Sequence, residues 1–287
     1  MTPFQYARPE SLDELLALLQ QHGPHARLLA GGTDLMVRLR ARRDVPRIVI
    51  DLKHVGALRA DVTSTRDGIS IGARTVMTDI AGSALVQRYF PALVEAALVV
   101  GSVQIRNRAT LSGNICNASP AADTAPVLLA YEATVNLIGA AGSRSITLEE
   151  FFIGPGRTAM MPAEIVQSVD LPLPGPQTGT AFGRLTRRRG VDLAIINLCC
   201  HVKASGDVRF ALGAVGPRPF LVRDESGILM DDSRTDHERD AVLERLLTAA
   251  APISDLRASD AYRSAMLPIF ARRTLNAAID RMRRSGA

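Results

Sequence analysis

The sequence contains no tryptophan, and aromatic residues make up only 4% of its 287 residues. Proteins that bind single-stranded nucleic acid need aromatic side chains on which the bases stack. The composition therefore argues against a nucleic-acid-binding module, even though the formal net charge is +5. We interpret most of the excess arginine as solvated faces and helix C-termini. For the three arginines at 187–189, a solvated or salt-bridged edge and contact with an anionic ligand remain equally open.

Cysteine and histidine are also scarce. The three cysteines, Cys116, Cys199 and Cys200, form no Cys-x-x-Cys pair. Adjacent residues of a strand point to opposite faces, so Cys199 and Cys200 cannot readily bind one metal ion together, and we expect buried, inert thiols. The five histidines, which form no plausible cluster, are His22, His25, His54, His201 and His237. The sequence thus predicts neither a metal site nor an iron–sulfur cluster in this chain.

Long apolar runs and the common nucleotide motifs are missing too. The sequence has no apolar run of membrane-spanning length and no signal-peptide pattern at its start. We therefore expect a soluble, cytoplasmic protein without a membrane span. Neither Gly-x-Gly-x-x-Gly nor Gly-x-x-x-x-Gly-Lys-[Ser/Thr] occurs, which argues against a Rossmann dinucleotide site and against a P-loop.

Apolar periodicity and turn residues divide the chain into three parts, 1–54, 55–177 and 178–287. The first is a small α/β unit that begins with a capping box at Ser11 and Glu14, and we expect Asp34 to cap a second helix. The second is α+β, and a proline- and glycine-rich linker near residue 177 ends it. The third combines antiparallel strands with two long amphipathic helices. The sequence therefore predicts an α+β fold.

The predicted elements follow from the same patterns. Helices are expected at 12–22, 35–42, 78–83, 91–100, 237–250 and 260–284. Strands are expected at 27–30, 47–52, 68–73, 133–138, 145–147, 165–171, 180–185, 192–203 and 207–215. The stretch 106–117 is expected to be irregular, and 126–131 is a compact apolar segment.

Two short glycine-containing segments carry the most specific chemistry. The first glycine segment, residues 30–34, is Ala-Gly-Gly-Thr-Asp and follows a predicted strand; the second, residues 110–114, is Thr-Leu-Ser-Gly-Asn. Glycines allow backbone N–H groups to converge on phosphate oxygens, and hydroxyl side chains add donors. Taken singly, each segment is more often a plain tight turn than a phosphate site.

Read in order, the motifs of this chain resemble one family. Residues 28–35 (Leu-Leu-Ala-Gly-Gly-Thr-Asp-Leu), 110–115 and 117–123 (Asn-Ala-Ser-Pro-Ala-Ala-Asp) are similar to those of the FAD-binding (medium) subunits of molybdenum hydroxylases. That family includes the carbon monoxide dehydrogenase and xanthine dehydrogenase group. The resemblance continues through residues 164–166, 182–194 and 211–219, and so spans nearly the whole chain.

The resemblance implies a fold and a set of FAD contacts. The fold is a two-part FAD-binding domain of the PCMH (vanillyl-alcohol-oxidase-like) type, followed by a C-terminal domain of antiparallel sheet plus helices. Asp123 is implied to contact FAD, Val166 to lie near the flavin ring, and Arg184 to lie beside it. The residues implied to hold the pyrophosphate are Leu28, Leu29, Ala30, Gly31, Gly32, Thr33, Asp34, Leu35, Thr110, Leu111, Ser112, Gly113 and Asn114.

Two positions depart from the family pattern. Ser112 stands where relatives usually have glycine, and a positive φ there would strain it by about 1 kcal/mol; without that requirement, Ser112 adds a donor. Arg184 stands where relatives often have lysine, and a planar guanidinium is not a point charge. The geometry at the ring edge is therefore open at this position.

The implied function is oxidoreductase electron relay. A large molybdopterin subunit oxidises the substrate, a small subunit with [2Fe–2S] clusters passes electrons to the FAD of this chain, and an external acceptor such as NAD, a quinone or oxygen receives them. A dimer of heterotrimers is expected, with no catalytic acid or base in this chain. The alternatives are a free-standing FAD-dependent oxidase or reductase with its own substrate, and a non-enzymatic anion-binding or nucleic-acid-binding protein.

Overall fold

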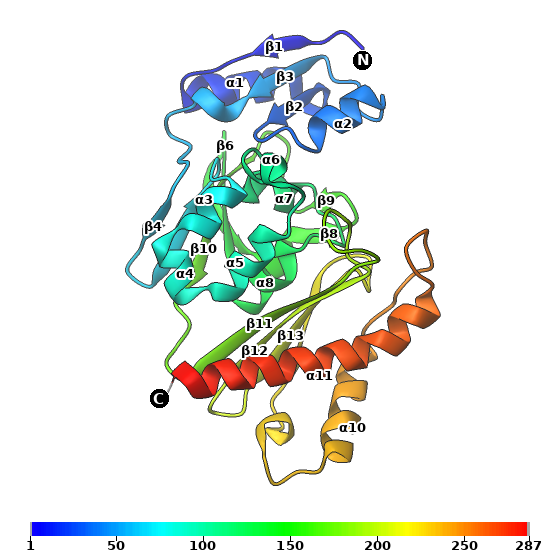
Figure 1. The fold of residues 1–287 in the computed structure, drawn as a ribbon. Helices are drawn as coiled ribbons and strands as arrows, with labels where there is room; N and C mark the ends of the chain where they lie inside the picture. Colours follow the sequence, from blue (N-terminus) through cyan, green and yellow to red (C-terminus); the bar gives the residue numbers. More distant parts are fainter. Residues whose placement is uncertain (1, 286–287) are drawn as a thin grey trace.

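The computed structural model describes residues 2–285, which form three larger sheets stacked along the molecule (Figure 1) and one two-stranded sheet. The first is a parallel sheet of order β1-β3-β2. Ser11 caps the first helix by accepting from the N–H of Glu14, and Leu15, Leu19 and Ile50 fill the core beneath it. Its elements are β1 (Gln5–Ala7), α1 (Leu12–His22), η1 (Gly23–His25), β2 (Ala26–Leu29), α2 (Leu35–Arg40), β3 (Ile48–Asp51) and η2 (Leu52–His54).

The second sheet is antiparallel, of order β4-β5-β10-β6-β7, with a bulge in β10 between Val166 and Ser168. Its strands are β4 (Val62–Ser64), β5 (Gly68–Gly72), β6 (Thr134–Gly139), β7 (Gly142–Thr147) and β10 (Ile165–Pro172); a separate pair is β8 (Phe152–Gly154) and β9 (Arg157–Thr158). Its helices are α3 (Met77–Gly82), α4 (Ala84–Tyr89), α5 (Pro91–Leu98), α6 (Val103–Arg106), α7 (Leu111–Cys116), α8 (Thr124–Ala130) and α9 (Leu148–Phe151).

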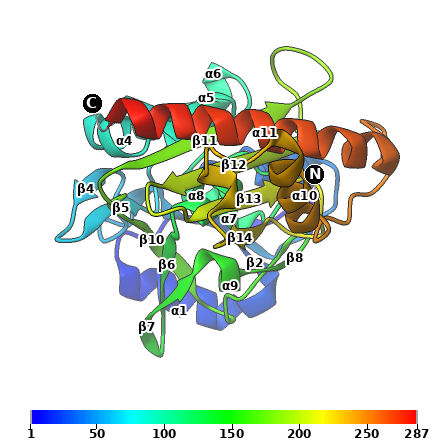
Figure 2. The same cartoon turned by 90° about the horizontal axis from the view of Figure 1, so that it is seen from below.

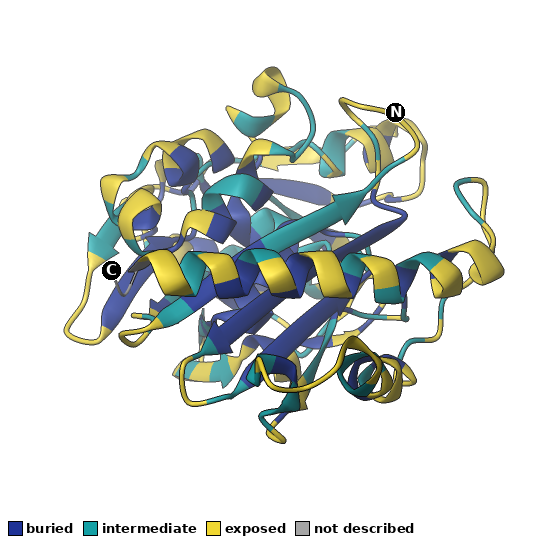
Figure 3. Ribbon diagram, turned by 60° about the horizontal axis from the view of Figure 1, so that its bottom comes forward, coloured by how far each residue is buried: buried dark blue, intermediate teal, exposed yellow. Residues whose placement is uncertain are grey.

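The third sheet is antiparallel, in the chain order β11-β12-β13-β14. The long helix α11 lies across β11 and β12 (Figure 2). Its inward residues are buried against the strands, while its outward residues are exposed (Figure 3). The elements are β11 (Thr178–Leu185), β12 (Ile196–Lys203), β13 (Val208–Gly213), β14 (Phe220–Asp224), η3 (Ile228–Met230), α10 (Asp236–Leu247) and α11 (Asp260–Ser285).

Helix α8 joins the second and third parts. All of its residues are buried, and it packs against β12 and β13 on the face opposite α11. Cys199 belongs to the core shared with α8, whereas its neighbour Cys200 belongs to the core under α11. The prediction that these two thiols point to opposite faces is therefore confirmed.

The structure differs from the sequence-based expectation in several elements. The stretch 106–117 is not irregular, because α6 ends and α7 lies within it. The expected strand at 192–203 begins only at Ile196, since the preceding residues form a loop, and the short edge strands β1 and β14 were not expected. Among the described residues, no helix has both the length and the apolar character needed to cross a membrane.

Candidate functional site

A cavity of about 700 Å³ lies where the three parts meet. Its wall combines the segment after β2, the start of α7, the segment before α8, β10 and the loop after β11. Among the described residues, no group of three or more His, Cys, Asp or Glu side chains is placed to hold a metal ion. The chemistry of the cavity therefore comes from its hydrogen-bonding groups and its shape.

The first glycine segment presents a row of unpaired backbone donors. The N–H groups of residues 31–34 have no hydrogen-bond partner among the described residues, and these residues line the cavity. Gly32 has a φ of 77°, which favours glycine. A Cβ on Gly31 would lie 2.0 Å from the carbonyl oxygen of Arg108, so this glycine lets the chain before α7 pass against the first segment.

Asp34 does not cap α2, contrary to the expectation from sequence. Its backbone is already helical and its carboxylate makes no bond to the N–H groups of that helix. Oδ1 instead accepts from the Asn117 side chain at 3.3 Å, after α7. Burial raises the pKa of the Asp34 carboxyl, which Arg38 partly opposes. Asp34 thus links the two glycine segments.

The second glycine segment forms the first turn of α7 rather than an open turn. Thr110 caps the helix by accepting from the N–H of Gly113 at 3.1 Å, and the N–H groups of Leu111 and Asn114 bond to the carbonyls of Thr75 and Thr110. Ser112 is not at a positive φ, so the strain considered from sequence is absent. Its hydroxyl is buried, lines the cavity and has no partner among the described residues.

Asp123 and Arg184 form a buried ion pair at another wall of the cavity. Arg184 Nε donates to Asp123 Oδ1 at 3.0 Å, and its NH2 group donates to the carbonyl of Asp192. Asp123 lines the cavity, whereas Arg184 lies behind it. The guanidinium is thus directed at a carboxylate and not into the space where a ring would lie.

The cavity has an apolar side. Val166 of β10 is 5% exposed and lies beside Ile165, Met160 and Cys116 in the wall. Burial raises the pKa of the Cys116 thiol to about 12, so the thiol stays protonated. One side of the cavity therefore suits an uncharged ring system, while the glycine segments suit an anion.

The structure brings most of the expected site residues to this cavity. Leu29 and Leu111 are the remaining exceptions besides Arg184, since they flank the two glycine segments without lining the space. Several wall residues from loops and from α6 were not predicted as site residues: Val100, Gly101, Ile105, Val191, Asp192, Leu193 and Arg257. Val191 and Leu193 are apolar residues in an otherwise polar loop, and this pattern could have indicated that they line a binding site. Both are about half exposed.

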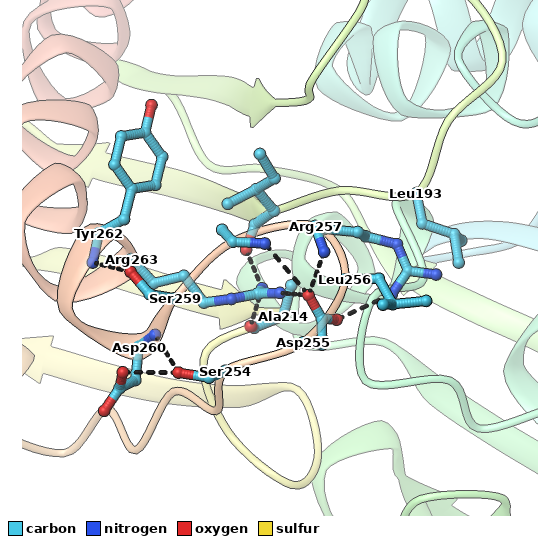
Figure 4. A network of polar contacts seen from close by, with 12 residues as sticks. Leu193, Ala214, Ser254, Asp255, Leu256, Arg257, Ser259, Asp260, Tyr262 and Arg263 are labelled. Carbon is cyan, nitrogen blue, oxygen red and sulfur yellow. Dashed lines mark hydrogen bonds and ion pairs between the residues drawn. The ribbon is translucent and has the colours of Figure 1, made fainter.

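A polar network around the buried Arg263 fixes the loop that carries Arg257 (Figure 4). Arg263 at the start of α11 donates to the carbonyls of Ile195 and Ala214 and to Asp255 Oδ1. Burial opposes ionisation of Asp255, but hydrogen bonds from Arg257 and Ala258 lower its pKa to about 2. The loop is further tied to the wall by Arg187, which bonds to the carbonyl of Leu256 and to Asp192.

The unpaired donors and the apolar wall fit a ligand with anionic groups at one end and a flat ring at the other. The row of backbone N–H groups would hold phosphate oxygens, and the orphaned Ser112 hydroxyl adds a donor on the facing segment. The carboxylate of Asp123 supplies an acceptor for a ligand hydroxyl. These groups come from separate elements that converge on one space.

Comparison with known proteins gives the same family at each level. Residues 2–174 match the model of the FAD binding domain in molybdopterin dehydrogenase, and residues 181–278 match the CO dehydrogenase flavoprotein C-terminal domain. The chain is 32% identical to the carbon monoxide dehydrogenase medium chain of Hydrogenophaga pseudoflava, covering 96% of both chains. It is 33% identical to the glyceraldehyde dehydrogenase medium chain of Sulfolobus acidocaldarius, covering 93% of this chain and 95% of that one.

Solved structures agree. A chain of the reconstituted CO dehydrogenase from Oligotropha carboxidovorans superposes with a TM-score of 0.90 at 28% identity, covering 97% of this chain and 98% of that one. A chain of the carbon monoxide dehydrogenase from Hydrogenophaga pseudoflava gives 0.89 at 32% identity, covering 98% and 99%. With both halves of the sequence matched and the fold shared throughout, the chain belongs to the family of FAD-binding subunits of molybdopterin dehydrogenases.

Proposed function

We propose that this chain is the FAD-binding electron-transfer subunit of a molybdenum hydroxylase complex and binds FAD without a covalent bond in the cavity described above. The observation that carries the proposal is that the N–H groups of residues 31–34 and the Ser112 hydroxyl line one cavity that also has an apolar wall. None of these groups has a hydrogen-bond partner in the part of the chain that the structure describes. When bound, FAD supplies the redox chemistry by taking up electrons singly and giving them up in pairs.

The residues of this chain bind and orient the cofactor. The first glycine segment and Ser112 would hold the pyrophosphate oxygens, Asp123 would accept from a hydroxyl of FAD, and Val166 would pack on the ring. The protonated Cys116 thiol in the wall is a poor nucleophile, which supports non-covalent binding. No proton transfer by this chain is required for electron relay.

The partners we propose are a small [2Fe–2S] subunit and a large molybdopterin subunit, assembled as a dimer of heterotrimers in the cytoplasm. The relatives are named for different substrates, including carbon monoxide, glyceraldehyde, xanthine and nicotinate, although their FAD-binding chains are alike. This pattern supports a substrate that is chosen by the large subunit and not by this chain. We likewise propose part boundaries near residues 54 and 177.

Flavin content tests the proposal. The purified chain should carry FAD, with flavin absorbance bands, and acid precipitation should release the flavin into the supernatant. Gly32→Val and Gly113→Val should each abolish retention. Valine at Gly32 is incompatible with a φ of 77°, and a Cβ at Gly113 would lie 2.9 Å from the Thr110 hydroxyl that caps α7.

Two glycines provide matched controls. Gly227 has a φ of 74°, and neither Gly227 nor Gly82 has an atom within 4 Å of its would-be Cβ. Gly227→Val therefore reproduces the backbone strain of the first variant away from the cavity, and Gly82→Val does the same for a helical position. Both controls should retain flavin. Normal flavin content in the Gly32 and Gly113 variants would count against the assignment of the cavity.

A further inference from the structure

Arg184 and Asn197 lie side by side on the third sheet and both reach Asp123. They are cross-strand partners on β11 and β12, in direct register. Arg184 Nε and Asn197 Nδ2 each donate to the same oxygen, Asp123 Oδ1, at 3.0 Å. Asn197 is fully buried and also donates to the carbonyls of Ala121 and Ala122, so it holds the segment that carries Asp123 as well as its carboxylate.

A third residue of the same row makes room for this arrangement. Gly213 on β13 is the cross-strand partner of Asn197. A Cβ on Gly213 would lie 2.1 Å from Asn197 Oδ1, so the amide can occupy its position only because this residue has no side chain. Arg184, Asn197 and Gly213 thus lie side by side on three neighbouring strands. The first two bind the Asp123 carboxylate, and the third leaves space for the Asn197 amide.

With Oδ1 occupied twice, the second oxygen of Asp123 is left for a ligand. Oδ2 accepts no hydrogen bond from any described residue, and Asp123 lines the cavity. Burial raises the pKa of the Asp123 carboxyl above its ordinary value, and Arg184 and Asn197 oppose this effect without cancelling it. The pair therefore fixes the direction of the carboxylate and favours its charged form, in which both oxygens only accept.

We propose that Arg184 and Asn197 are positioning residues for FAD: together they form a clamp that aims Asp123 Oδ2 at a hydroxyl of the cofactor, and so make the cofactor affinity depend on the third sheet. This inference rests on the proposed function, because it concerns the same cavity. It also reassigns Arg184, which the family resemblance placed beside the flavin ring.

The identity of residue 184 matters to the clamp. Its guanidinium bridges Asp123 on one side and the Asp192 carbonyl on the other, in the loop that lines the cavity. The planar fork can do both at once, whereas a lysine ammonium on a flexible stem holds no such fixed pair of directions. Arginine at this position therefore couples the carboxylate to the cavity loop.

The test measures the FAD dissociation constant of the full-length chain by fluorescence titration, from about pH 5 to about pH 9. Arg184→Gln should weaken FAD binding by about tenfold or more, the scale of a hydrogen bond to a charged group. In the wild-type chain, affinity falls at acid pH as Asp123 takes up a proton. Without Arg184 the pKa of Asp123 rises further, so this fall should move to higher pH.

The other charged groups that line the cavity are unchanged in every variant, so they contribute equally to each pH profile: Arg27, Asp34, Arg38, Asp44, Arg187, Arg188, Asp192 and Arg257. Arg184→Lys keeps the positive charge but not the fork, so it should lose affinity with a smaller shift of the pH profile. In an Asp123→Asn background, Arg184→Gln should have little further effect on FAD, because it acts through Asp123.

Arg209 provides the matched control. It is a buried arginine of the same sheet, and it pairs with Glu132 of the second part at 2.6 Å, away from the cavity. Arg209→Gln should lower stability and leave the FAD affinity and its pH profile unchanged. An Arg184→Gln chain with wild-type affinity and pH profile, or an equal loss in Arg209→Gln, would overturn the clamp.

If Arg184→Gln does not fold, Gly213→Ala decides the question. This substitution removes no donor and no charge, but the new Cβ displaces the Asn197 amide. Gly213→Ala should therefore also weaken FAD binding. Unchanged binding in a folded Gly213→Ala chain would overturn the clamp. A wild-type chain that binds no FAD would count against the proposed function, whereas a wild-type chain that binds FAD with unaffected variants counts against the clamp alone.

Discussion

At the scale of single residues, the cavity depends on groups that have no hydrogen-bond partner among the described residues. These groups are the buried hydroxyl of Ser112 and the backbone N–H groups of residues 31–34. Leaving a buried polar group unsatisfied costs about 1–3 kcal/mol. A ligand that satisfies the buried Ser112 hydroxyl recovers that free energy on binding. The more exposed N–H groups of residues 31–34 add donors that suit an anion.

Gly31 gives a prediction at this scale. Its would-be Cβ meets the backbone of Arg108, which cannot move aside without shifting the chain that leads into α7. Gly31→Ala should lower the free energy of unfolding by about 1–3 kcal/mol, the usual cost of overpacking, and should weaken FAD retention because the two glycine segments separate. Urea unfolding and flavin content measure the two effects.

The control for this substitution is Gly56→Ala. Gly56 has no atom within 4 Å of its would-be Cβ and no positive φ, so alanine there should leave stability and flavin content close to wild type. A Gly31→Ala chain as stable as the wild type would mean that the two segments do not touch as described.

At the scale of elements, the long helix α11 does more than cover the third sheet. Arg263 in its first turn is 2% exposed and holds the ends of β12 and β13 through the carbonyls of Ile195 and Ala214. The same guanidinium binds Asp255, which orders the loop before the helix. The start of α11 thereby positions the loop (Figure 4) that contributes Arg257 to the cavity wall.

Asp255 gives the prediction for this element. Its pKa is lowered from 3.8 to about 2 in the folded chain, so its ionised form stabilises the fold at neutral pH. A carboxyl group whose pKa is lower in the folded than in the unfolded chain stabilises the fold at pH values above its unfolded-state pKa. This contribution is lost as the pH falls through the folded-state pKa. Asp255→Asn should therefore lower the free energy of unfolding at pH 7, with the difference from wild type shrinking below about pH 4.

Denaturant unfolding across this pH range measures the difference. Asp79→Asn, at an exposed position of α3, is a suitable control and should show no comparable dependence. A difference between Asp255→Asn and wild type that stays constant down to about pH 2 would contradict the role given to the ionised carboxylate.

At the scale of the whole molecule, the second and third parts share one core. Helix α8 is buried between them, and the apolar cluster around it includes Cys199 and Ala211 from the third sheet. Two ion pairs reinforce the contact, Arg209 with Glu132 and Arg281 with Glu95. Destabilising α8 should therefore destabilise the second and third parts together.

Leu128 of α8 tests this coupling. Leu128 is fully buried, and Leu128→Ala should lower the free energy of unfolding by about 2–5 kcal/mol. Because the core is shared, hydrogen exchange should accelerate together in β6 of the second part and β12 of the third. Leu256→Ala, at a side chain 98% exposed, should change stability by less than about 0.5 kcal/mol. Acceleration confined to β6 would contradict a shared core.

The sequence by itself determined the local features of this protein. The Ser11 cap, the strand before the first glycine segment and the opposite faces of Cys199 and Cys200 follow from spacing along the chain, and the structure has them. The family and its FAD-binding function followed from motifs in order, and the comparisons confirm both. The cap, the strand and the two thiols follow from short-range patterns because they depend on neighbours within a few residues, whereas the family follows from the order of motifs along nearly the whole chain.

Only the tertiary structure decided which groups are left unpaired. Asp34 reaches Asn117 instead of its own helix, and Gly113 gives its N–H to Thr110, so one expected donor is already used. Arg184 binds Asp123, which lies 61 residues earlier in the chain. The pairing of β11 with β12 places Asn197 next to Arg184, and no local sequence pattern predicts this arrangement. Each of these outcomes is a competition between partners far apart in the chain, and the fold settles it.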